Sequence, residues 1–172
     1  MTDAALGEEK LPSSAPSGWR AQLEVEAQLQ WRVLRRHPWL ARAMSVTRPR
    51  ALPNAIAHAE WVLRALDGHG LDAASRMHMH IILHGFIKGI TVNLETEAEA
   101  VSETGMSDDE WMRIQEADFT AFAASGRYPA FASVLLELSS GFDLDFEALF
   151  EQGLRAILDG FARIIERTKR RL

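Results

Sequence analysis

Apolar residues recur at helical spacing along almost the whole chain, most clearly in its last long segment. From near Asp143–Asp145 to about Arg170, apolar and glycine positions follow one another in alternating steps of four and three residues. This rhythm predicts a helix that packs along a seam. The seam positions are Phe146, Phe150, Gly153, Ile157, Gly160 and Ile164.

The rest of the pattern predicts further helices separated by prolines, glycines and capping residues. The segment from Trp19 to Arg36 carries two apolar stripes and only a narrow polar face, which predicts a central helix covered on most sides. Convincing strand-like alternation appears nowhere, so the predicted fold class is all-α, a multi-helix bundle. The other expected helices run from Pro38 through Met44, from Pro53 through Leu66, from about Ala73 to Glu95–Glu99, from Ser107 or Asp108 through Phe122, and through Phe131 and Leu138.

The first eighteen residues have a different composition, rich in Ser, Pro, Gly and acidic residues. Such a composition predicts a loop more often than a packed element. We therefore expect residues 1–18 to form an N-terminal stub and linker outside the core. Residues 19–172 are expected to form one domain.

Composition narrows the class of protein. The chain has no cysteine, which excludes disulfides and thiolate metal sites and is typical of a protein from the reducing cytoplasm. No apolar run approaches the roughly 18–20 residues of a membrane span, and no signal-peptide pattern follows Met1, so we expect no membrane partner. The formal net charge of −5 argues against this chain alone binding a phosphate backbone.

Three histidines in the middle of the chain raise the question of a metal site. On a helix His80 and His84 share a face, whereas His78 points elsewhere, and no carboxylate occupies a matching position. We therefore expect no metal and no other cofactor. Histidines in or beside an apolar cavity, bonded to one another or to a ligand, are the favoured interpretation.

Two pairs of glycines interrupt otherwise apolar helices. Gly85 and Gly89 lie one turn apart, and Gly153 and Gly160 lie seven residues apart on the last helix. Each glycine costs about 1 kcal/mol relative to alanine inside a helix. A local kink is one explanation, but a close approach by another helix is the favoured one.

Signatures of an enzyme are absent from the sequence. Gly68-x-Gly70 follows a helix and lacks the third glycine of a dinucleotide-binding motif, and neither a P-loop nor a Gly-x-Ser-x-Gly elbow occurs. An enzyme is therefore disfavoured. A helical enzyme with dispersed catalytic residues stays open as an alternative.

The order of several short landmarks resembles the C-terminal half of the tetracycline-repressor (TetR) family of bacterial regulators. The resemblance covers roughly residues 6–168 and implies an all-helical domain that binds a small effector and dimerises through a four-helix bundle. The landmarks are Gly18-Trp19-Arg20, Arg35 to Leu40, Thr47-Arg48-Pro49, Pro53-Asn54, Ala59-Glu60 to Leu66 with Gly70, Gly85 to Gly89, Tyr128-Pro129, and Phe146 to Gly160.

The resemblance also implies where the two sites lie. The cavity would take a small hydrophobic effector, although an ordinary core position is the alternative for each large side chain. Its walls would be Trp39, Met44, Trp61, Met77 and Phe86, with His80 and His84 as polar anchors. The homodimer interface would contain Gly85, Gly89, Phe150, Gly153, Ile157, Gly160 and Ile164.

Two departures from the family pattern limit what it implies. Met44 and Asn93 stand where the tetracycline-binding members carry a histidine and a glutamate that hold magnesium and drug, so tetracycline with magnesium is not the expected effector. The chain opens with residues that resemble the helix just after the DNA-binding head. We therefore expect DNA contact only through a helix-turn-helix head that this chain lacks.

The function predicted is thus the effector-binding and dimerisation domain of a TetR-like repressor. An effector in the cavity would change the angle between the two subunits. The alternative from another class is a small helical enzyme or small-molecule carrier that uses the same cavity.

Overall fold

The described part of the chain is helical throughout, with no strand among its residues. The computed structural model describes residues 1–138, 141–142 and 144–170, without the side chain of Ala98. These residues divide into two compact units, Met1–Glu95 with Phe146–Leu172, and Thr96–Asp145. This division differs from the single domain expected over residues 19–172. The all-α class is confirmed.

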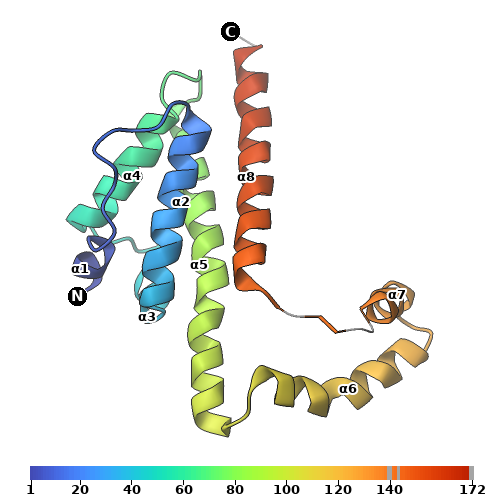
Figure 1. The fold of residues 1–172 in the computed structure, drawn as a ribbon. Coiled ribbons are helices and arrows are strands. Elements are labelled where there is room, and N and C mark those ends of the chain that lie inside the picture. The colour runs from blue at the N-terminus through green and yellow to red at the C-terminus, as the bar shows by residue number, and fades with distance from the viewer. Residues whose placement is uncertain (139–140, 143, 171–172) are drawn as a thin grey trace. The chain divides into compact units, whose positions relative to one another are not determined.

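The described residues of the first unit form six helical segments, drawn in Figure 1. α2 packs against α4 and α8, and α1 packs against α2 and α4. α2 buries eight residues, which confirms the central helix that its two apolar stripes predict. The bounds are α1 Thr2–Leu6, α2 Trp19–Arg36, α3 Trp39–Ala43, α4 Pro53–Ala65, α5 Ala73–Thr104, whose last residues belong to the second unit, and α8 Phe146–Lys169.

The ends of these helices follow from local chemistry. Pro53 occupies the first turn of α4, where a missing N–H costs nothing. Gly68 and Gly70 both adopt positive φ after α4, as expected of residues that stop a helix. The Asp72 side chain accepts a hydrogen bond from the Ser75 amide at 2.7 Å and caps α5. α8 begins at Phe146, and Asp143, near its expected start, lies outside the described residues.

Aromatic rings fill the core between α2, α5 and α8. Trp31 stacks on Phe150 with ring centroids 4.5 Å apart, and Phe86 stacks on the same Phe150 at 6.3 Å. Trp31 and Phe150 are almost completely buried. These three rings fix the registers of α2, α5 and α8 against one another.

The expectation that residues 1–18 lie wholly outside the core is wrong for α1. Ala5 and Leu6 are buried with the core residues of the first unit. Asp3 attaches α1 to α4, because its carboxylate accepts from the Asn54 amide at 2.8 Å and its carbonyl accepts from the Asn54 side chain at 2.9 Å. Composition alone did not reveal this attachment, since a single carboxylate and a single amide provide it.

The second unit holds α6 (Asp108–Ala124) and α7 (Pro129–Glu137), together with the end of α5. Ser107 and Glu110 form a reciprocal capping box at the start of α6. Phe119 contacts Phe131 with ring centroids 6.1 Å apart, but neither α6 nor α7 buries a residue. Within the described residues, every helix is too short or too polar to cross a membrane.

Candidate functional site

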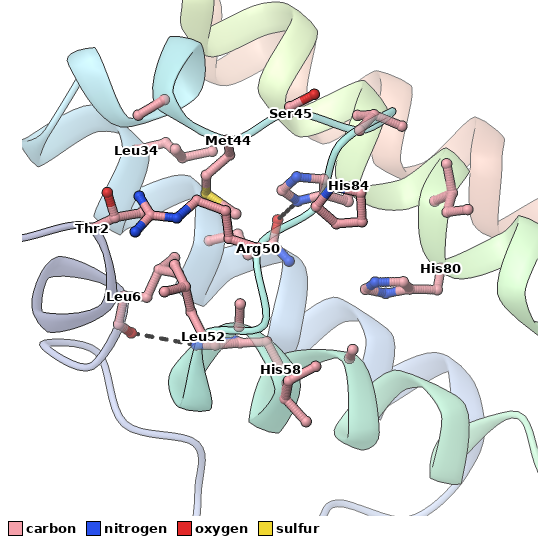
Figure 2. A pocket seen from close by; sticks show the side chains of 18 of the residues that line it. Thr2, Leu6, Leu34, Met44, Ser45, Arg50, Leu52, His58, His80 and His84 are labelled. Carbon is pink, nitrogen blue, oxygen red and sulfur yellow. Dashed lines mark hydrogen bonds between the residues drawn. The ribbon is translucent and has the colours of Figure 1, made fainter.

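A cavity of about 220 Å³ lies within the first unit, between helices α1 to α5 and the segment that connects α3 to α4 (Figure 2). The lining is mainly apolar, with a few polar side chains. α1 contributes Thr2 and Leu6, α2 contributes Gln30 and Leu34, α4 contributes Ala55, Ile56, His58 and Ala59, and α5 contributes Met77, His80, Ile81 and His84. α3 contributes its last residue, Ala43, and the connecting segment adds Met44, Ser45, Val46, Pro49, Arg50 and Leu52.

The connecting segment leaves space because its conformation cannot continue a helix. α3 ends as Met44 takes an extended conformation, and α4 restarts only at Pro53. Lys88 of α5 donates a hydrogen bond to the Met44 carbonyl and so holds the segment near α5. A short α3 with non-helical residues on both sides therefore keeps the longer helices apart at this point.

A chain of polar groups runs from the interior to the cavity wall. Glu26 of α2 is fully buried and does not itself line the cavity. Its Oε1 accepts a hydrogen bond from Gln30 Nε2, and Gln30 Oε1 lies 2.9 Å from His84 Nδ1. Glu26 Oε2 has no hydrogen-bond partner in the described part of the chain.

His58 connects this buried carboxylate to α1. Its Nδ1 lies 3.3 Å from Glu26 Oε1, within range of an ion pair, and its Nε2 lies 3.4 Å from the Leu6 carbonyl. Both neighbours are acceptors, so both ring nitrogens are suited to carry protons. Burial lowers the pKa of His58, but the hydrogen bond and charge of Glu26, with the Leu6 carbonyl, raise it above its ordinary value overall.

The two histidines of α5 are shifted in the opposite direction. Burial is the largest cause that lowers the pKa of His84, and repulsion from the charged forms of His80, Lys88 and His58 adds to it, so that the pKa falls to about 4 in total. Burial also lowers the pKa of His80, although Glu26 partly opposes this. At neutral pH both imidazoles at this wall are therefore uncharged.

The charge on the cavity wall is limited to one permanent cation. Arg50 is the only Lys or Arg that lines the cavity, and no Asp or Glu is among the described lining residues. The Arg50 side chain forms no ion pair within the described residues, whereas Arg32, Arg36 and Arg42 of the same unit are paired with glutamates. The cavity thus combines an apolar body, the two neutral imidazoles of α5, the His58 ring paired with Glu26, and one guanidinium without an ion pair among the described residues.

Four of the seven residues expected at a ligand site line this cavity: Met44, Met77, His80 and His84. The other three lie elsewhere. Trp61 donates from Nε1 to the Gln22 carbonyl at 2.8 Å and lines a separate hollow beneath the loop of residues 11–15. Trp39 packs edge-on against His37, and Phe86 faces α8. The expectation that these three rings wall the cavity is corrected accordingly.

Sequence reasoning missed Gln30, His58 and Arg50 at the wall and Glu26 behind it. The sequence did contain one indication of the polar groups of α2. Glu26 and Gln30 lie four residues apart and outside the polar face of that helix. Polar residues on an apolar face need partners when buried. No comparable signal marks Arg50, whose position depends on the path of an irregular segment.

The residues expected at a dimer interface divide into two groups. Phe150 is fully buried within its own chain, and a Cβ added at Gly153 would lie closer than 3.0 Å to the Phe86 ring. Both therefore serve the core of this chain, and Phe150 leaves no surface for a partner. Ile157 packs partly against the same core. Gly85, Gly89 and Gly160 face open space, and Ile164 is 43% exposed.

Metal-binding geometry is not seen in the described residues, where no three His, Asp or Glu side chains gather closely enough to hold an ion. His80 and His84 instead lie with nearly parallel rings, their centroids 6.4 Å apart. Their chemistry here is that of neutral hydrogen-bonding groups on an apolar wall.

The chain matches the family model described as "Tetracyclin repressor-like, C-terminal domain" over residues 11–165. It is 34% identical over 170 residues to the HTH-type transcriptional repressor DrrR1 of Streptomyces coeruleorubidus, covering 96% of this chain and 61% of that protein. It is 32% identical over 162 residues to an HTH-type transcriptional regulator of Saccharopolyspora erythraea, covering 93% of this chain and 62% of that protein. The chain thus spans less than two thirds of the length of these relatives. It belongs to the tetracycline-repressor family of transcriptional regulators, through the family's C-terminal domain.

Proposed function

We propose that this chain is the effector-binding and dimerisation domain of a transcriptional repressor, and that the cavity beside α1 holds a small, mainly apolar effector. The observation that carries the proposal is the cavity itself, whose walls are apolar side chains with a few convergent polar groups. Such an arrangement is typical of small-molecule sites. Met44 and Met77 in its wall can adapt their shape to different ligands.

The position of α1 supports a role in transmission. Thr2 and Leu6 of α1 line the cavity, and the Leu6 carbonyl faces His58. A ligand that displaces these groups would move α1 relative to α4. In this proposal, a helix-turn-helix head outside this chain makes the DNA contact, and movement of α1 alters its placement.

Dimerisation is the second part of the proposal. No described residue covers the faces of α5 and α8 at Gly85, Gly89 and Gly160, and Ile82 and Ile164 beside them are 49% and 43% exposed. Two helices from each copy would form a four-helix bundle that covers these faces. A two-fold arrangement is the commonest way for identical chains to do so.

A cavity-filling substitution tests the effector site. Ala59 of α4 lines the cavity, whereas Ala57 of the same helix does not and instead lines the hollow near Trp61. Compounds from an apolar library that raise the melting temperature of the wild type should fail to do so with Ala59→Trp. The matched variant Ala57→Trp should respond like the wild type. Equal responses from all three proteins would contradict this placement of the site.

A further inference from the structure

The hydrogen-bond chain behind the cavity fixes which ring nitrogen of His84 carries a proton. Within the proposed effector site, on which this step rests, that nitrogen determines the kind of ligand that the site selects. Glu26 is fully buried, and its carboxylate acts as an acceptor. Gln30 is also buried and lies between Glu26 and His84.

The orientation of the Gln30 amide follows from its acidic neighbour. Nε2 donates to Glu26 Oε1, because the opposite orientation would place two acceptor oxygens against each other. Gln30 Oε1 therefore points to the other side, where His84 Nδ1 lies 2.9 Å away. An amide oxygen only accepts, so His84 Nδ1 must donate and carry the proton.

The second nitrogen of His84 is then an acceptor. With its pKa lowered to about 4, the imidazole is neutral at pH 7 and holds one proton, which Gln30 places on Nδ1. Nε2 thus keeps its lone pair. Within the described residues no group donates to Nε2, and the His84 ring forms part of the cavity wall (Figure 2).

We infer that His84 Nε2 is the acceptor for a hydroxyl group of the effector, which is a mainly apolar compound bearing that hydroxyl. The rest of the wall agrees with this class of ligand. Among the described lining residues Arg50 is the only permanent cation and none is a carboxylate, which disfavours a positively charged ligand. Gln30 and Glu26 act as positioning residues, since they set the His84 tautomer from behind the wall.

The tautomer can be measured without any ligand. Long-range ¹H–¹⁵N correlation spectra of protein labelled at histidine distinguish a protonated Nδ1 from a protonated Nε2. At pH 7 we expect His84 to be protonated at Nδ1 in the wild type. Gln30→Met removes the acceptor at similar length and should move the proton toward Nε2, whereas Gln28→Met on the same helix should not. A wild-type His84 protonated at Nε2 overturns the inference.

Ligand selectivity provides the second readout, with 2-naphthol and its ether 2-methoxynaphthalene as probes. The alcohol donates a hydrogen bond and the ether cannot, so the ratio of their dissociation constants reports the bond to His84. We expect the dissociation constant of the ether divided by that of the alcohol to be roughly two- to tenfold smaller in Gln30→Met than in the wild type. The reason is that the variant loses one neutral hydrogen bond to the alcohol. Gln28→Met should keep the wild-type ratio.

The outcomes separate the two proposals. If both probes shift the signals of cavity residues but the ratio is the same in wild type and Gln30→Met, the hydroxyl inference is overturned and the effector site stands. If neither probe shifts those signals in the wild type, the effector site itself is contradicted and the hydroxyl inference falls with it. If Gln30→Met fails to fold, the position of the proton on His84 in the wild type still tests the hydroxyl inference.

Discussion

His58 and His84 belong to one hydrogen-bonded cluster around Glu26, yet their proton affinities are shifted in opposite directions. His58 directly faces the carboxylate and the Leu6 carbonyl, two acceptors that stabilise its charged form. His84 reaches the same carboxylate only through the neutral amide of Gln30. The intervening amide explains why burial determines the behaviour of His84 and an opposite charge determines that of His58.

The lowered pKa of His84 predicts how stability depends on pH. Between about pH 6.5 and 4 the unfolded chain binds a proton at this histidine that the folded chain does not, so the free energy of unfolding decreases as pH falls. The full loss is on the order of 3 kcal/mol, and His80 acts in the same direction. Urea unfolding from pH 7 to 5 should show this slope before the carboxylates are protonated.

His84→Gln should flatten that pH profile, because it removes the titrating group. His78→Gln, an exposed site on the same helix, is the matched control and should keep the wild-type slope. A slope that is unaltered in His84→Gln would show that other groups cause the acid sensitivity.

The Glu26–His58 pair predicts a non-additive pair of substitutions. His58→Leu leaves the buried carboxylate without its cationic neighbour and should lower the free energy of unfolding by about 3 kcal/mol. The double variant with Glu26→Leu removes the stranded charge and should recover much of that loss. Chemical denaturation measures both, and a double variant less stable than His58→Leu alone would contradict this account.

At the scale of the helix, the contact between α5 and α8 depends on one glycine. The Phe86 ring occupies the space where a side chain at residue 153 would begin. Gly153→Ala should therefore lower the free energy of unfolding by about 1–3 kcal/mol through overpacking, despite the better helix propensity of alanine. Thermal or urea unfolding provides the measurement.

Gly160→Ala is the control for that substitution, because among the described residues outside its own helix backbone no atom lies within 4 Å of a Cβ at residue 160. It should leave the packing of α5 against α8 unchanged and gain up to about 1 kcal/mol of helix propensity within the chain. If both alanine variants were equally destabilised, the Phe86 contact would not be the cause at residue 153.

Helical periodicity accounts for both the successes and the errors of the sequence predictions. Local patterns sufficed for the all-helical class and the burial of α2. They also argue against Phe86 and His84 lining the same cavity, because residues two positions apart on a helix point in directions about 200° apart. The same spacing separates Trp61 from Ala59 on α4. Which face of a helix meets the cavity depends on tertiary packing, which no single helix encodes.

The division of the chain and the attachment of α1 were also beyond the sequence pattern. Helices in the range 96–145 have apolar periodicity like the others, yet α6 and α7 bury nothing among the described residues. Periodicity predicts that a face is apolar but not which partner covers it. The bonds between Asp3 and Asn54 join residues 51 positions apart, which no local pattern can anticipate.

At the scale of the whole molecule, the open faces of α5 and α8 predict self-association. We expect a dimer at micromolar concentration by light scattering. Gly160→Arg places a charge on the face of α8 where an added Cβ meets no described atom within 4 Å, so it should convert the dimer to a folded monomer. Circular dichroism verifies the fold, and a wild type that is monomeric at that concentration would refute the prediction.

The placement of the tryptophans has a practical consequence for finding the effector. None of the five indole rings lines the cavity, and Trp61 lies on a different face of α4. A colourless compound that does not absorb near the indole emission band can therefore fill the cavity and leave intrinsic fluorescence almost unchanged. A fluorescence screen would record such a compound as inactive, while a readout based on heat resistance or on histidine resonances would register it.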